Sequence, residues 1–274
     1  MKFELVIDSR STEVVIALLK EGKLVELHKE KHDNNYSVGD IYLGKVKKIV
    51  PGLNASFVNV GHEKDGFLHY LDLGAQVNSF KKFIDKTRNK KLNTASLKNF
   101  RREKDTLKEG KIQDILKSGD HILVQVSKEP ISSKGPRLST ELSFAGRYMV
   151  LIPFSDRVSV SQKIRSSEER SRLKKLIHSI KPKGFGVIIR TVAENKKVAE
   201  LDKDLKNLYK KWQSIYKKLK TSNLTERIHG ELNRSSAILR DLLNSEFSKI
   251  HVNNADLHSE LKEYLSRISP EQEK

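Results

Sequence analysis

One hairpin at residues 55–70, "ASFVNVGHEKDGFLHY", constrains the fold more than any other part of this sequence. Two short apolar runs flank a polar stretch with glycine at each end, which is typical of a tight turn between strands. Alternate side chains of a strand share a face. Val58 and Phe57 therefore point to different faces of their strand, and so do Leu68 and Phe67. Each strand already has an apolar face for a core, so each Phe needs a second explanation.

Short strands and closely spaced glycines continue on both sides of this hairpin and predict a small β-barrel. "GDIYLGKVKKIVPG" precedes the hairpin, and "GDHILVQVSKE" follows later as a strand that closes the barrel. A barrel of the OB type binds single strands by stacking bases on exposed aromatic rings while cations hold the backbone. Phe57, Phe67 and His69 suit that role. The pattern is equally compatible with both Phe side chains lying in the barrel core or at its end.

The charge of the chain favours a polyanionic partner. There are 53 Lys and Arg against 35 Asp and Glu, a formal net charge of +18. Such an excess indicates a nucleic acid or an acidic membrane surface, rather than cations that only aid solubility. No run is long and apolar enough to span a membrane, and the N-terminus lacks a secretory apolar region. The absence of cysteine excludes disulfides and Cys-based zinc sites, and the simplest expected location is the cytoplasm.

Residues 78–117 differ in composition from the rest. They hold thirteen Lys or Arg and five Asp or Glu, with few β-branched residues and no clear period. We expect a long basic insertion that is at least partly flexible, and that either adds nonspecific affinity for RNA or is a solvated loop.

The second half of the chain is mostly helical by its pattern. "SSEERSRLKKLIHSI" begins with a Ser at a capping position and a Glu three residues later. Leucines and Trp212 spaced along 198–220 predict one long amphipathic helix. Residues 235–244 and 256–267 are expected as helices on either side of a short strand, "FSKIHV".

Two places offer cations for an anion. Lys134 lies beside Gly135 in a polar loop between strands, where it could meet a phosphate. The strand "GVII" ends in Arg190 and Thr191, and an Arg fork with a neighbouring hydroxyl can hold a phosphate group. Lys163 and Arg165 belong to the same block. A solvated Lys and a surface Arg in a salt bridge are the competing interpretations, and the pattern alone favours them.

The sequence offers little for catalysis. Asp202 and Asp204 are two apart on a predicted helix, so they do not share a face. Asp8 ends the first strand, where two-metal nucleases of the RNase H fold carry an acid. Its partners would come from acids such as Glu26, Glu246 or Asp256, and no cluster is evident.

The residues from 40 to 191 resemble the bacterial RNase E/G family of endoribonucleases. The likeness rests on "GDIYLGKVKKIVPGLNASFVNVGHEKDGFLHYLDLG", then "ILVQVSKEPISSKGPRLSTELSFAGRYMVLIP" and "GFGVIIRT", in the family's order and spacing. "KGPRL" is similar to the RNase G branch. The resemblance implies an α+β, multidomain fold: an OB-fold RNA-binding barrel, inserted with a 5′-sensor region into a split RNase H-like α/β subdomain. The implied boundaries are 1–35 plus 223–274 for the split subdomain, 36–139 for the barrel with its insertion 78–117, and 140–222 for the sensor region.

The resemblance also implies roles for individual residues. Phe57 and Phe67 match the two barrel aromatics that contact RNA, and Lys134 matches a cation at the barrel edge. Arg190 and Thr191 match the pair that holds a 5′-monophosphate. The expected RNA-binding residues are Phe57, Phe67, His69 and Lys134, and the expected 5′-phosphate residues are Arg190, Thr191, Lys163 and Arg165.

By this resemblance the chain is the RNA-recognition part of a single-strand-specific endoribonuclease of RNA processing and decay, which includes rRNA maturation and mRNA turnover. The family cleaves with Mg²⁺ held by aspartates of a DNase I-like subdomain beyond the last residue here. We therefore expect no catalytic residue, metal or cofactor in this chain, and an N-terminal portion that binds single-stranded RNA without cutting it. The full-length enzyme is expected to be a homo-oligomer, whereas this portion alone could be a monomer. No membrane partner is expected. The alternatives are a stand-alone RNA-binding protein and a nuclease that uses Asp8.

Overall fold

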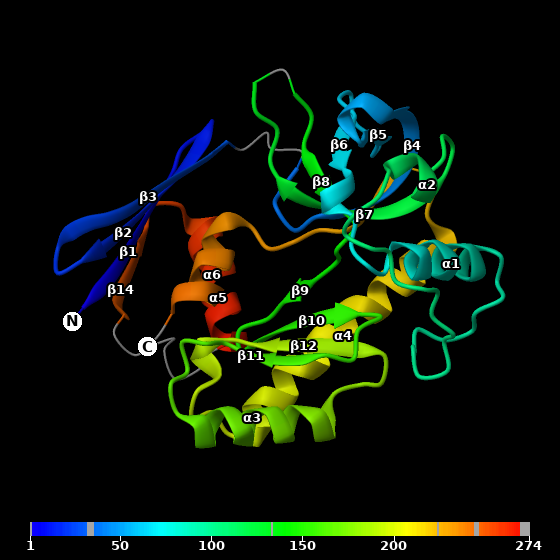
Figure 1. Ribbon diagram of the computed structural model, residues 1–274. Coiled ribbons are helices and arrows are strands. Elements are labelled where there is room, and N and C mark those ends of the chain that lie inside the picture. Colours follow the sequence, from blue (N-terminus) through cyan, green and yellow to red (C-terminus); the bar gives the residue numbers. More distant parts are fainter. Residues whose placement is uncertain (1, 32–35, 133, 224, 244–246, 269–274) are drawn as a thin grey trace. The chain divides into compact units, whose positions relative to one another are not determined.

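Contacts between residues divide the chain into a larger and a smaller unit. The computed structural model describes residues 2–31, 36–132, 134–223, 225–243 and 247–268. The larger unit comprises residues 36–231, and the smaller one joins residues 1–35 to 232–274. Both units combine helices with strands, so the predicted α+β class is confirmed (Figure 1). Among the described residues, no helix is both long and apolar enough to cross a membrane.

The larger unit contains a closed barrel of five strands, consistent with the expected OB type. Strands β4, β5, β6, β8 and β7 pair in that order, and β7 pairs again with β4. Apolar side chains such as Val58, Leu68 and Val124 fill its interior. A Cβ on Gly66 would lie 2.4 Å from Leu138 Cδ1, so this glycine lets β6 approach β8 closely. The strands are β4 Ile41–Val50, β5 Ala55–Asn59, β6 Gly66–His69, β7 His121–Lys128 and β8 Arg137–Ser139.

A sixth strand, β13 (Glu226–His229), pairs with the first half of β4. The family resemblance implies that residues from 223 onward belong to the split subdomain, whereas the contacts place the division between residues 231 and 232. The reason lies in the packing of β13. Ile228 is buried in the main core, and Arg227 Nη1 lies 3.4 Å from Oδ2 of the buried Asp40.

A second sheet of the larger unit has the strand order β11, β12, β10, β9. β11 and β12 run parallel, while β10 is antiparallel to both its neighbours. Helix α3 packs against β11 and α4 against β10. The predicted cap is confirmed, because Ser166 Oγ accepts a hydrogen bond from Glu169 N at the start of α3. The elements are β9 Phe144–Ala145, β10 Met149–Pro153, β11 Val158–Val160, β12 Phe185–Ile189, α3 Ser167–Ile180 and α4 Val198–Thr221.

Both ends of the basic segment 78–117 pack on the rest of the larger unit, whereas residues 101–111 are irregular and mostly exposed, so the expectation of a solvated loop holds for that stretch alone. Helix α1 (Val77–Arg88) buries Phe80, Phe83 and Ile84 against α4. This spacing is the helical period, which the many lysines between these residues obscure. Burying a Phe side chain is worth about 1.5–3 kcal/mol, which is enough to hold a charged segment in place.

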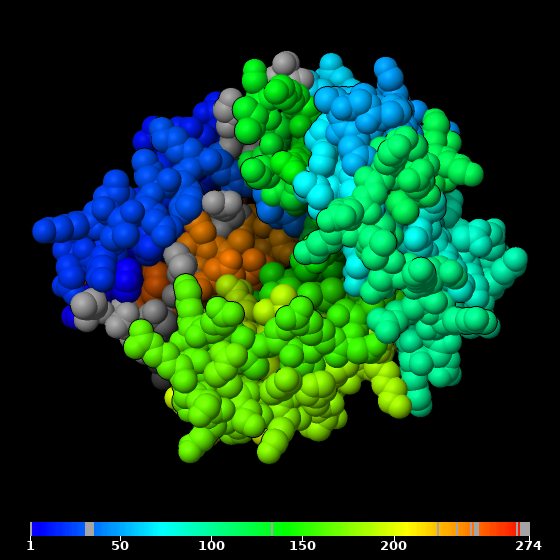
Figure 2. All heavy atoms as spheres, viewed as in Figure 1, coloured from blue at the N-terminus to red at the C-terminus, as the bar shows by residue number. Residues whose placement is uncertain are grey.

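The stretch that follows α1 is held to α4 by two hydrogen bonds. Trp212 Nε1 donates to the Ala95 carbonyl at 2.7 Å, and Tyr216 Oη donates to the Leu92 carbonyl at 2.7 Å. Helix α2 (Ile112–Ile115) then returns the chain to the barrel core through Ile112. In Figure 2 the segment, coloured teal, forms a broad part of the surface of the larger unit.

The smaller unit is assembled from two segments separated in the sequence by the whole of the larger unit, residues 36–231. Its sheet has the order β14, β1, β2, β3, in which β1 and β14 run parallel, with Leu5 opposite Ile250. The buried side of this sheet packs on Leu239 of α5 and Leu261 of α6. Its RNase H-like character stays a prediction. The elements are β1 Phe3–Ser9, β2 Glu13–Lys20, β3 Lys23–Lys31, α5 Arg234–Leu242, β14 Phe247–Val252 and α6 Ala255–Ile268.

Candidate nucleic-acid interface

Phe57 and Phe67 lie side by side on the barrel, outside its core. They are direct partners across β5 and β6, with ring centroids 5.9 Å apart at an interplanar angle of 67°. Both are half-buried, while their neighbours Val58 and Leu68 are fully buried. The core interpretation of these two Phe side chains is therefore wrong. The alternation predicted in the sequence puts their rings on the opposite face of the sheet.

Cations flank this pair in the strand register. Lys48 of β4 is opposite Phe57, Arg137 of β8 is opposite Phe67, and Lys128 of β7 is opposite Arg137. All three cationic residues are exposed. We call these five residues the aromatic row. A row of two aromatic rings with cations at both ends has the composition of a surface that binds single-stranded nucleic acid.

Arg137 is the most firmly held cation of the row. Its Nε lies 2.9 Å from Asp72 Oδ2, and its Nη2 lies 3.2 Å from Asp72 Oδ1. The Asp72 carbonyl also accepts from Ser139 Oγ and Thr140 N. This pairing orients the guanidinium beside Phe67 and offsets part of its charge.

Lys134 lies near the row, in the loop between β7 and β8, and is exposed. Its backbone N–H donates to the Ile131 carbonyl. A Cβ on the next residue, Gly135, would be 2.0 Å from the Asp65 carbonyl oxygen, so the loop passes directly over the start of β6. The Phe67 N–H donates to the carbonyl of Pro136 at 2.8 Å. The structure thus places the backbone of Lys134 close to the strand that carries Phe67.

His69 has a local structural task. Its Nδ1 accepts a hydrogen bond from Leu71 N at 3.1 Å and so caps the short helix η2 (Tyr70–Asp72). It is half-buried, opposite Ala55. A contact with RNA remains a prediction for this residue.

Arg190 and Thr191 lie where β12 ends, beside the end of its parallel neighbour β11. Thr191 Oγ1 is 3.0 Å from Ser161 Oγ, the residue directly after β11. Arg190 Nη1 donates to the Gly146 carbonyl at 2.9 Å, and Arg190 N donates to the Tyr148 carbonyl. We call Ser161, Arg190 and Thr191 the Arg190 site. Guanidinium and hydroxyl groups are donors of the kind that bind a phosphate group, although one of the two hydroxyl hydrogens is used in the Ser161–Thr191 bond.

The two other predicted members of this site differ in their placement. Lys163 N donates to Ser161 Oγ at 3.3 Å, so the backbone of Lys163 reaches the site while its side chain is exposed. Arg165 is also exposed. Within the described residues, no hydrogen bond or ion pair joins the Arg165 side chain to Arg190 or Thr191.

Asp204 of α4 binds the backbone segment that contacts Arg190. Its Oδ1 accepts from Arg147 N at 3.2 Å and its Oδ2 from Tyr148 N at 2.9 Å. A Cβ on Gly146 would lie 2.6 Å from Asp204 Oδ2, so a larger residue there would displace the Asp204 carboxylate. Burial raises the pKa of Asp204, although the backbone N–H groups oppose this rise. The carboxylate thereby fixes the segment whose Gly146 carbonyl holds Arg190.

Sequence reasoning missed Ser161, Gly146 and Asp204. One signal was available for Asp204. It falls between Leu201 and Leu208 on the apolar stripe of α4, where a carboxylate needs buried partners. Ser161 and Gly146 carry no comparable signal, because the pairing of distant strands brings them to Arg190.

Asp8 is engaged in contacts that order the end of β1. Its Oδ2 pairs with Arg10 Nε at 2.8 Å, and its Oδ1 accepts from Asn253 Nδ2 at 2.6 Å. One of its proposed acidic partners, Glu246, lies outside the described residues. Within the described part of the chain, no three His, Asp or Glu side chains gather where they could hold a metal ion.

Comparison with known proteins identifies similar sequences. A family model described as "Ribonuclease E/G family" matches residues 143–274. Ribonuclease G of Haemophilus influenzae is 32% identical over 268 residues, which cover 98% of this chain and 51% of that protein. Ribonuclease G of Escherichia coli is 31% identical over 271 residues, covering 99% and 52%. Ribonuclease E of Synechocystis is 36% identical over 229 residues, covering 83% and 30%. The chain spans about half the length of the two ribonuclease G relatives.

Proposed function

Because the chain belongs to the ribonuclease E/G family, we propose that it is the RNA-recognition portion of a single-strand-specific endoribonuclease of RNA processing and decay. The observation that carries this proposal is the half-buried Phe57–Phe67 pair, which lies outside the barrel core and has cations next to both rings in the strand register. Rings buried in the barrel core could not contact RNA. On the surface they offer a stacking platform.

In this proposal the aromatic row holds the body of the RNA strand. Bases stack on Phe57 and Phe67, at about 1–3 kcal/mol per base, while Lys48, Lys128 and Lys134 contact the phosphates. Stacking does not depend on the identity of the base, because every base has an aromatic face. The row therefore supplies affinity for single strands in general.

The Arg190 site recognises the 5′ end. A terminal monophosphate carries more negative charge than an internal phosphodiester and has more free oxygens. The Arg190 guanidinium, together with the Thr191 and Ser161 hydroxyls, supplies donors for those oxygens. A 5′-hydroxyl end has no phosphate to occupy the site. The site thus distinguishes the chemical state of the 5′ end.

Cleavage is assigned to another part of the full-length enzyme. There, a Mg²⁺-activated water would attack the phosphodiester. The residues described in this chain position the strand for that reaction and take no chemical step themselves.

The test is the binding of a short 3′-labelled single-stranded RNA with either a 5′-monophosphate or a 5′-hydroxyl. Salt is held fixed, since a chain of net charge +18 binds any RNA when salt is low. We expect the monophosphate to bind more tightly. Arg190→Ala should remove about 10- to 150-fold of that preference, the value of a charged hydrogen bond of about 1.5–3 kcal/mol. Lys174→Ala, an exposed cation of α3, is the matched control.

Equal binding of the two RNAs by the unaltered chain would contradict end recognition. An equal loss for both RNAs in Arg190→Ala would make Arg190 a general backbone contact. Melting of each variant separates these outcomes from loss of the fold.

A further inference from the structure

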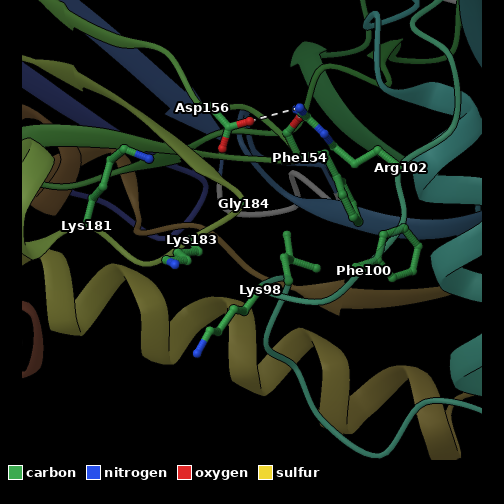
Figure 3. A pocket seen from close by; sticks show the side chains of 9 residues that line it. Lys98, Phe100, Arg102, Phe154, Asp156, Lys181, Lys183 and Gly184 are labelled. Atoms are coloured by element: carbon green, nitrogen blue, oxygen red, sulfur yellow. Dashed lines mark hydrogen bonds and ion pairs between the residues drawn. The ribbon is translucent and has the colours of Figure 1, made fainter.

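A pocket of about 280 Å³ opens in the larger unit, away from the residues discussed so far. It lies between the segment around residues 97–102 and the two loops that precede β11 and β12 (Figure 3). No member of the aromatic row or of the Arg190 site lines it. We call it the lysine pocket, and its lining residues are Leu97, Lys98, Phe100, Arg102, Phe154, Asp156, Lys181, Lys183 and Gly184.

The walls of this pocket are held in place by packing. Phe100 and Phe154 have ring centroids 5.1 Å apart, and Leu97 is buried. Gly184 has a φ of +83°, and a Cβ on it would lie 2.6 Å from Leu97 Cβ. Only glycine satisfies both conditions, because φ is positive and no room remains for a side chain. The two walls therefore meet at Leu97 and Gly184.

The pocket carries an excess of positive charge. Four cationic side chains and one carboxylate line it. Arg102 is engaged, because its Nη2 pairs with Asp156 Oδ2 at 2.8 Å and its Nη1 donates to the Phe154 carbonyl. Lys181 Nζ donates to the Phe185 carbonyl at 2.9 Å, which satisfies one of its N–H groups without offsetting its charge.

Lys98 and Lys183 are the two cations of the pocket whose ammonium groups are available to bind a ligand. Both are exposed, and neither ammonium group contacts a protein acceptor among the described residues. Lys98 follows Leu97, and Lys183 precedes Gly184, so the two lysines flank the close contact between the walls. Figure 3 shows them on a different side of the pocket from the Arg102–Asp156 pair.

We propose that the lysine pocket is a second anion site, which binds a phosphate group of an RNA backbone or of a free nucleotide. This inference goes beyond the function proposed above, which uses neither Lys98 nor Lys183. The volume suits a phosphate with its sugar, because pockets for larger cofactors run from about 300 to 1,000 Å³. Exposed, flexible ammonium groups suit the phosphodiester of a passing strand, since they bind it as point charges.

The experiment compares two double variants of the full chain. Lys98→Gln with Lys183→Gln removes the two cations of the pocket. Lys175→Gln with Lys217→Gln removes the same charge from exposed positions on α3 and α4 that do not line the pocket. The probe is a 3′-labelled single-stranded RNA with a 5′-hydroxyl, titrated at several salt concentrations.

The pocket variant should bind this RNA about 3- to 10-fold more weakly than the control variant. Its salt slope should be smaller by about 1.4, because each lost phosphate contact on a single strand lowers the slope by about 0.7. A second titration uses AMP and distinguishes the two sources. Weaker AMP binding with unchanged RNA binding assigns the pocket to a free nucleotide, and weaker RNA binding assigns it to a strand.

Two results would overturn the inference. The first is a pocket variant that matches the control variant with both probes. The second is a change in the ratio of 5′-monophosphate to 5′-hydroxyl RNA binding, which would mean that the lysines serve the 5′ end. That ratio depends on Arg190 in the proposed function, so failure of the pocket and failure of end recognition give different results.

Discussion

The aromatic row and the Arg190 site differ in how their residues are brought together. The row comes from neighbouring strands of one barrel, so its members meet through strand register alone. The Arg190 site joins the ends of β11 and β12 to a segment that Asp204 fixes from α4. A surface built by strand register suits a contact that repeats along an RNA strand. A site assembled from several elements suits the recognition of one group, the 5′ end of the RNA.

This comparison predicts that the two surfaces fail in different ways. Damage to the row should lower affinity for every single strand alike. Damage to the Arg190 site should lower only the preference for one end.

The largest effect is expected when both rings are removed. Phe57→Ala with Phe67→Ala should weaken RNA binding at least tenfold whatever the 5′ end, because each stacked base contributes about 1–3 kcal/mol. Fluorescence anisotropy with both RNAs measures this. Leu71→Ala, an exposed apolar residue of the same barrel, is the matched control. Unchanged affinity in the double Phe variant would exclude the row as the RNA platform.

A smaller and more selective effect is expected from Asp204→Asn. The segment at Gly146 should loosen, because Asn accepts fewer hydrogen bonds than a carboxylate. A lost hydrogen bond of about 1 kcal/mol should reduce the preference for 5′-monophosphate RNA about 3- to 10-fold. Binding of 5′-hydroxyl RNA should not change. Asp202→Asn, which removes a surface pair with Lys206, is the control. A preference equal to that of the unaltered chain would show that Asp204 does not position Arg190.

The fold should survive this substitution. Because burial raises the pKa of Asp204, its charged form costs stability once the pH rises above the pKa of an unfolded Asp. Asn carries no charge and avoids that cost at neutral pH. The melting temperature at neutral pH should therefore stay close to that of the unaltered chain, and a large drop would contradict this account.

The smallest effect distinguishes the two cations that lie next to the rings of the row. Lys48→Gln should weaken RNA binding about two- to threefold and lower the salt slope by about 0.7, the value of one phosphate contact. Arg137→Gln should change the slope less, because Asp72 already offsets the Arg137 charge. Titrations at several salt concentrations measure both slopes. A larger change for Arg137 would reverse this order.

The parts of the structure that depend on local patterns could be predicted from the sequence. Alternation placed Phe57 and Phe67 on the opposite face from Val58 and Leu68 but left open which face is the core, and capping predicted the start of α3 at Ser166. The period of Phe80, Phe83 and Ile84 in α1 was also present, but the surrounding lysines hid it.

The parts that depend on distant pairing could not be predicted in this way. Ser161 reaches Thr191 only because β11 runs parallel to β12, and no local pattern encodes that pairing. The lysine pocket likewise needs Leu97 to meet Gly184 across a large separation in sequence. Contacts of this kind come from the fold as a whole rather than from any one segment.

The parallel pairing of β1 with β14 has a consequence for synthesis of the chain. The first three strands leave the ribosome early, but β14 and the helices that cover Leu5 and Ile7 follow some 200 residues later. At about 5–20 residues per second, this interval lasts roughly 10–40 s. During that time the apolar side of the sheet is uncovered while the larger unit folds. Until β14, α5 and α6 are made, Leu5 and Ile7 therefore lack the partners that bury them, and an uncovered apolar surface of this kind is prone to aggregate.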